Sequence, residues 1–166
     1  GRIFGCLREN DLFKNTWVIF TADHGEMLGD HHMSQKNLFF EGSAHVPLLI
    51  MPPQGRSLPH NISVEAPTDL VDIYPTILAM AGLSSPVSVS GKNLLEPVPM
   101  DRMFFGNSLN KNFCVMEEKV KLVYSAVGDH VLLFDLNTDP MEQHNLAEDP
   151  AWQERKAKLW KLLLEH

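Results

Sequence analysis

Residues 16–36, TWVIFTADHGEMLGDHHMSQK, decide how the rest of the sequence is interpreted. The stretch opens with TWVIFT, a short apolar run of β-branched and aromatic residues. Such a run is typical of a strand covered on both faces, as in a parallel sheet. It then changes abruptly to acidic, imidazole and amino side chains. Because ligands of open α/β sheets bind beyond the carboxyl ends of the strands, this change predicts a polar site at the end of a buried strand.

The sequence around this stretch predicts an α/β fold. Residues 2–13 carry apolar side chains at nearly helical spacing, and VPLLIM at 46–51 is a second candidate for a buried strand. DIYPTILAMAG predicts a further helix, in which Asp72 is the N-cap, Pro75 lies in the first turn and Gly82 ends the helix. We therefore expect part of a sheet with flanking helices.

Beyond about residue 100 the pattern changes to short strand candidates at close spacing. RMFFG, NFCVMEE, KVKLVYSA and VLLFDL predict a small antiparallel meander. Asp149 and Pro150 predict the start of a final helix. The apolar stripe of that helix, which we expect to pack on the meander, consists of Trp152, Leu159, Trp160 and Leu163. We place the boundary between the α/β part and the meander with its helix between residues 98 and 99.

The composition is that of an ordinary globular protein. The sequence has 166 residues, of which 44% are hydrophobic and 21% charged. Its net charge of −7 argues against nucleic acid or an anionic membrane surface as the main partner. No apolar run approaches the ~20 residues that a membrane-spanning helix needs. Cys6 and Cys114 make no disulfide framework, and we expect both to be buried thiols.

Asp23 and His24 are the candidate ligands of a divalent cation. Asp offers a hard anionic oxygen and His a borderline nitrogen, and a tight turn at Gly25 would let both side chains converge on one ion. Lys36 follows in the same stretch, where its charge would hold an anionic substrate group against the metal. The alternative is a solvated Asp at a strand–loop junction and an ordinary surface lysine.

The same stretch resembles the sulfatase family of the alkaline-phosphatase superfamily. That family shows a strand ending in T-x-D-[HN]-G, an L-G-[DE]-H stretch, a Lys, and a (Y/F)-E-x-S-x-x-V-P-L segment that FFEGSAHVPLLI matches. Three further family segments are similar to VDIYPTILAMAGL, GKNLLEPV and LLFDLNTDPMEQHNLAED, in the same order. A single D-H-G triplet is a weak signal, but ordered blocks over almost the whole chain are a specific one.

The resemblance implies roles for individual residues. Asp23 and His24 match two ligands of the divalent cation, usually calcium. Lys36 matches a catalytic lysine that contacts the sulfate oxygens, and His31 is a second candidate for substrate binding. Glu41 is expected to be structural, shaping the return into the second strand.

The family's nucleophile is absent from this sequence. It is a formylglycine made from a Cys or Ser within C-x-P-x-R or a close variant, and neither Cys6 nor Cys114 lies in such a motif. We therefore expect the chain to be the C-terminal part of a sulfuric ester hydrolase and to be inactive alone. Its expected partners are a sulfate ester and either the N-terminal half of the same enzyme or, by self-association, a second copy, because strand edges and apolar surface would otherwise be exposed.

Two alternatives remain open. A phosphonate or phosphate ester hydrolase of the same superfamily shares the D-H-G motif and would differ in its upstream nucleophile. A non-catalytic module, whose meander and helix bind a partner, would have no catalytic half upstream. The L-G-[DE]-H stretch and the D-P-x-E-x-x-N-L-A ending favour the sulfatase, and the resemblance favours export, for example to the periplasm.

Overall fold

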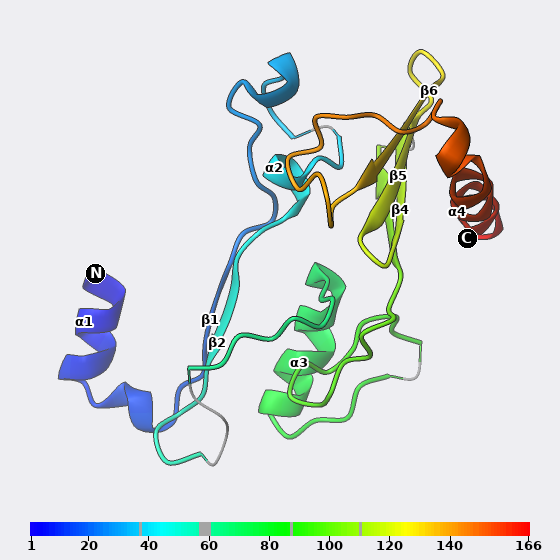
Figure 1. The fold of residues 1–166 in the computed structure, drawn as a ribbon. Coiled ribbons are helices and arrows are strands. Elements are labelled where there is room, and N and C mark those ends of the chain that lie inside the picture. Colours follow the sequence, from blue (N-terminus) through cyan, green and yellow to red (C-terminus); the bar gives the residue numbers. More distant parts are fainter. Residues whose placement is uncertain (37, 57–60, 87, 110) are drawn as a thin grey trace.

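The computed structural model describes residues 1–36, 38–56, 61–86, 88–109 and 111–166, which form two separate antiparallel sheets and several helices (Figure 1). One sheet pairs β1 (Val18–Thr21) with β2 (Leu48–Met51), and the other has the order β3-β4-β5-β6. Its strands are β3 (Phe104–Ser108), β4 (Asn112–Glu117), β5 (Val120–Ser125) and β6 (His130–Asp135). The α-helices are α1 (Arg2–Glu9), α2 (Glu41–Ala44), α3 (Ile73–Met80) and α4 (Gln153–Glu165). Short 3₁₀ turns lie at Leu12–Lys14, Asp30–His32, Leu70–Asp72 and Pro150–Trp152. The mixed α/β architecture predicted from the sequence is confirmed.

The strands β1 and β2 run antiparallel, with Val18 opposite Met51 and Thr21 opposite Leu48. The expectation of parallel strands is therefore wrong. The segment between them loops out beyond the carboxyl end of β1 and returns at that same end, whereas a parallel partner needs a crossover to the opposite end. The strands are also not covered on both faces, because Phe20 is 60% and Leu49 59% exposed.

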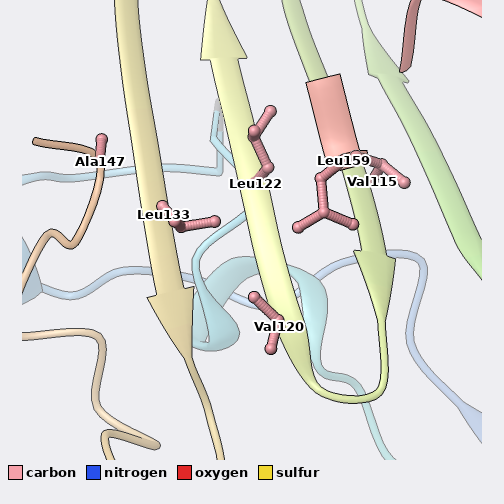
Figure 2. Close-up of a cluster of buried hydrophobic side chains, with 6 residues drawn as sticks. All are labelled: Val115, Val120, Leu122, Leu133, Ala147 and Leu159. Atoms are coloured by element: carbon pink, nitrogen blue, oxygen red, sulfur yellow. The ribbon is translucent and has the colours of Figure 1, made fainter. Parts of the chain in front are cut away.

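The meander and its covering helix agree with the sequence prediction. Consecutive strands from β3 to β6 pair antiparallel, and α4 packs against them. Figure 2 shows the core between them, which consists of Val115, Val120, Leu122, Leu133, Ala147 and Leu159. Trp152, Trp160 and Leu163 pack against this core as predicted. Asp149 caps the turn that precedes α4, since its carboxylate accepts a hydrogen bond from the Ala151 N–H at 2.9 Å.

Helix α3 forms where it was predicted, but Asp72 does not cap it in the expected way. Asp72 lies at the N-cap position of α3 but its side chain makes no cap bond to that helix. Its fully buried carboxylate instead accepts the Asp69 N–H at 2.8 Å, in a capping box around the preceding 3₁₀ turn, and also reaches another segment. That carboxylate accepts hydrogen bonds from the Lys92 N–H at 2.7 Å and from both terminal nitrogens of Arg102. Burial opposes the charge on Asp72, but Arg102 and the backbone N–H groups outweigh it and lower its pKa from 3.8. Asp72 thus joins α3 to residues 92–102.

The two cysteines differ in their surroundings. Cys114 is buried as expected, and burial raises the pKa of its thiol to about 12. Cys6 is exposed, so the expectation of a buried thiol is wrong there. It lies on α1, which buries none of its residues within the described chain.

None of the helices in the described residues is long and apolar enough to cross a lipid bilayer.

A buried ion cluster joins the loop after β1 to the meander. Lys121 on β5 is only 3% exposed, and its ammonium donates hydrogen bonds to Glu142 at 2.8 Å, to the carbonyl of Phe39 at 2.8 Å and to Glu41. Glu142 in turn accepts from the backbone N–H of Glu41 at 2.6 Å. Burial disfavours the charged lysine, but the two carboxylates outweigh this and raise the pKa of Lys121. Glu41 therefore helps to hold the loop after β1 against the meander, while its predicted role in shaping the return into β2 stays a prediction.

We expect Lys121→Met to lower the free energy of unfolding by about 3–5 kcal/mol, since it leaves buried carboxylate charge without its partner. Urea denaturation of the chain measures the loss. The matched control is Lys161→Met on α4, which removes an exposed pair with Glu165 and should cost under about 1 kcal/mol. Equal losses in the two variants would contradict the structural role of the cluster.

Candidate metal and anion site

The site begins where β1 ends and the chain turns at residues 23–25. The backbone N–H of Gly25 donates a hydrogen bond to the carbonyl of Ser43 in α2 at 2.8 Å. A Cβ on residue 25 would lie 2.1 Å from the carbonyl oxygen of Gly42, which is far inside contact distance. The turn therefore requires glycine, because a side chain would push it away from α2.

Within this turn, Asp23 and His24 bring two electron-pair donors together. The Oδ2 atom of Asp23 lies 3.4 Å from the Nε2 atom of His24. The Nδ1 atom of His24 lies 2.7 Å from the carbonyl oxygen of Gly25. Since a carbonyl oxygen can only accept a hydrogen bond, Nδ1 carries the proton and Nε2 keeps its lone pair. The Asp23 carboxylate and the Nε2 lone pair of His24 therefore lie together as two possible ligands of one cation.

Lys36 completes the group, because its ammonium contacts Nε2 of His24. Its backbone carbonyl accepts a hydrogen bond from the buried hydroxyl of Ser43 at 3.1 Å. The structure therefore brings together Asp23, His24 and Lys36, three of the four residues selected from the sequence. Ser43, which holds two sides of this group, was not selected, although the E-x-S pattern of FFEGSAHVPLLI contained the signal for it.

His31, the fourth candidate, lies in a different environment. Its ring stacks on Phe40, with ring centroids 4.0 Å apart and planes 13° from parallel. Phe40 in turn packs against Phe134 of β6. Among the described residues, no contact joins His31 to Asp23, His24 or Lys36. In this structure the ring of His31 thus covers a small apolar cluster beside the site.

The donors present fit two ligands of a divalent cation. In the part of the chain that the structure describes, no group of three or more His, Cys, Asp or Glu side chains is placed to hold a metal ion. The pair of Asp23 and His24 nevertheless has the right chemistry, a carboxylate oxygen beside an imidazole nitrogen. The hydrogen bond from His24 Nδ1 to a backbone carbonyl is also the usual outer contact of a metal-bound histidine. The pair would therefore serve as part of a larger ligand set.

Comparison with known proteins gives a consistent picture. The sulfatase family model matches residues 1–83. Arylsulfatase K of Xenopus laevis is 34% identical over 167 residues, which cover 89% of this chain and 31% of that protein. The chain thus spans about a third of the length of the curated relatives that it matches.

Two solved structures extend the similarity over nearly the whole chain. The putative sulfatase yidJ from Bacteroides fragilis has a TM-score of 0.82 at 26% identity, covering 98% of this chain and 37% of that one. The phosphonate monoester hydrolase of Agrobacterium radiobacter has a TM-score of 0.77 at 32% identity, covering 99% of this chain and 37% of that one.

We expect Gly25→Ala to lower the free energy of unfolding by about 1–3 kcal/mol, because its Cβ would break the contact of the turn with α2. Urea denaturation and the loss of hydrogen-exchange protection at the residue-25 amide measure the effect. The matched control is Gly5→Ala in α1, where a Cβ meets nothing within 4 Å. Since alanine favours a helix over glycine by up to ~1 kcal/mol, Gly5→Ala should be neutral or stabilising. An equally mild effect at residue 25 would contradict the close approach described here.

Proposed function

The chain belongs to the sulfatase family, and we propose that it is the C-terminal part of a sulfuric ester hydrolase whose metal and anion site is completed by an upstream half. The observation that carries the proposal is the gathering of Asp23, His24 and Lys36 at the carboxyl end of β1. A carboxylate, an imidazole lone pair and an ammonium in one group suit a cation and an anion bound side by side.

In this proposal Asp23 and His24 would be two of the ligands of a divalent cation, for which the family resemblance suggests calcium. The cation would supply charge stabilisation to the sulfate group. The Gly25 carbonyl keeps His24 in the tautomer whose Nε2 faces the cation. The Asp23 side chain is 87% exposed in the described chain, which leaves room for ligands from another segment.

Lys36 is the catalytic residue that this chain contributes. Its ammonium would bind the sulfate oxygens of the substrate and stabilise the negative charge on the transferring group. Because Lys36 contacts the same Nε2 atom that would ligate the cation, its ammonium would lie beside the cation and within reach of the bound anion. Substrate binding by His31 stays a prediction, with its ring resting on Phe40.

The proposed upstream half has two tasks. It would carry the formylglycine nucleophile and the remaining metal ligands, and it would cover apolar surface that the described chain leaves open. That surface includes Phe20 on β1, Leu49 on β2 and Ile3 on α1, all of them more than half exposed. The length of the relatives supports this, since the chain covers 31% of the Xenopus arylsulfatase K. An isolated chain would instead cover the same surface by self-association.

The alternative function is hydrolysis of phosphonate or phosphate esters. The structural similarity to the phosphonate monoester hydrolase of Agrobacterium radiobacter supports it. The family model and the arylsulfatase K relatives favour the sulfuric ester hydrolase. A non-catalytic binding module is the weakest proposal, because it gives no reason for an acid, an imidazole and a lysine to meet at one strand end.

We expect the isolated chain to hydrolyse neither 4-nitrophenyl sulfate nor a phenyl phosphonate ester above a blank, because it lacks the nucleophile. The protein extended by its upstream coding sequence, supplied with calcium, should hydrolyse the sulfate. Release of nitrophenol or phenol measures both reactions. Turnover by the pure isolated chain would contradict the proposal, and a preference of the extended protein for the phosphonate ester would establish the alternative.

The roles of Asp23 and Lys36 separate in the extended protein. Asp23→Asn should weaken calcium binding by about tenfold or more, because it removes ligand charge. Lys36→Ala should lower kcat/KM for the aryl sulfate by ~10²–10³-fold while calcium binding is kept. Calorimetry with calcium and steady-state kinetics measure the two effects. Lys161→Ala, an exposed lysine on α4, is the control and should change neither. Full activity of both site variants would refute the assignment.

A further inference from the structure

Ser43 contacts both segments that carry the proposed site. Its side chain is buried, at 4% exposure, in the short helix α2. Its hydroxyl donates a hydrogen bond to the backbone carbonyl of Lys36 at 3.1 Å. Its own carbonyl accepts from the backbone N–H of Gly25 at 2.8 Å. Ser43 therefore bonds both to the lysine segment and to the turn that carries the acid and the imidazole.

The contact with Gly25 reaches the imidazole through a single residue. The carbonyl of Gly25 accepts the Nδ1 proton of His24 at 2.7 Å, while the N–H of the same residue is held by Ser43. The hydrogen bond between Ser43 and Gly25, here called the backbone arm, uses only the carbonyl of Ser43, so any residue at position 43 could form it. The arm to Lys36 depends on the hydroxyl.

Helix α2 is itself held by its own backbone bonds and by contacts of residues 39 and 41 with Lys121 and Glu142. The backbone N–H of Ser43 donates to the carbonyl of Phe40 at 2.9 Å. The N–H of Glu41 donates to Glu142, and Lys121 donates to the carbonyl of Phe39. Ser43 thus lies in a well-held helix and bonds to both segments of the site, in addition to the bonds that join Lys36 to His24 and Gln35 to Glu26 and Met27.

We propose that Ser43 is a positioning residue that holds the main chain of Lys36 against the Asp23–His24 turn. This inference rests on the proposed function, because it assigns to Ser43 the placement of the lysine that would bind the sulfate group. The hydroxyl of Ser43 is buried and donates to a carbonyl, so it takes no part in the chemistry. Removing the hydroxyl takes away its bond to the main chain of Lys36, while Gln35 keeps its bonds to Glu26 and Met27 and the Asp23–His24 turn stays tied to α2.

The test is a double-mutant cycle in the extended protein with calcium and 4-nitrophenyl sulfate. Ser43→Ala should lower kcat/KM about three- to tenfold, the range expected for one lost hydrogen bond that aligns a group. Calcium affinity should stay within about twofold, because the backbone arm to Gly25 remains. In the Lys36→Ala background, Ser43→Ala should cause no further loss, since the group that it positions is gone. Ser43→Thr keeps the hydroxyl and should recover the activity.

A loss that persists undiminished in the Lys36→Ala background would overturn the proposal, because Ser43 would then act on the fold as a whole. So would an unchanged kcat/KM in Ser43→Ala. The affinity for inorganic sulfate, measured by calorimetry, gives an independent reading and should fall in Ser43→Ala as it does in Lys36→Ala. If Ser43→Ala does not fold, Ser43→Cys keeps the volume with a weaker donor and replaces it. An unaltered Lys36→Ala enzyme would refute the proposed function itself, which separates the two failures.

Discussion

The structure depends most on the buried ammonium of Lys121 and the carboxylates that surround it. Burying a lysine is costly, and it is tolerated here because Glu41 and Glu142 pair with it and the carbonyl of Phe39 takes a third hydrogen bond. These partners come from segments far apart in the chain. The cluster therefore forms only when the meander, the segment after β6 that carries Glu142, and helix α2 are all in place. It couples the loop after β1 to the C-terminal sheet.

The same logic appears again around Asp72. Its buried carboxylate is held by Arg102 and by the N–H of Lys92, and the hydroxyl of the neighbouring Thr76 accepts from the N–H of Leu94. The chain between α3 and β3 has little regular structure, so these polar contacts fix its path. Both clusters join sequence blocks that resemble family segments. Those blocks thus include residues whose buried polar contacts hold the fold together, whereas only the block around Asp23 carries the proposed chemistry.

Local patterns predicted the elements well because the forces that form them are local. Short strand candidates at close spacing predicted the meander, and Asp149 with Pro150 predicted the start of the last helix. Strand direction failed for β1 and β2, since an apolar run reports burial but not the end at which the chain returns. The burial of Lys121 was not predicted from the sequence, because the carboxylates that pair with it are remote in sequence. At the site, Asp23, His24 and Lys36 converge as expected. The stacking of His31 was not predicted, because it depends on left-handed backbone in the 3₁₀ turn that non-glycine residues seldom adopt.

The meander with α4 has a closed hydrophobic core, whereas the β1–β2 pair does not. This difference is relevant to the site because the site lies at the end of β1. The meander has a closed core in which Leu122, Leu133 and Leu159 are fully buried. Neither β1 nor β2 contains a fully buried residue, and each has one unpaired edge within the described chain. Asp23 and His24, the two proposed metal ligands, follow the end of this same open strand β1. A single upstream segment that packs on β1 would cover its apolar face and bring the missing donors to Asp23 and His24. Folding of the strand pair and assembly of the metal site would then be one event.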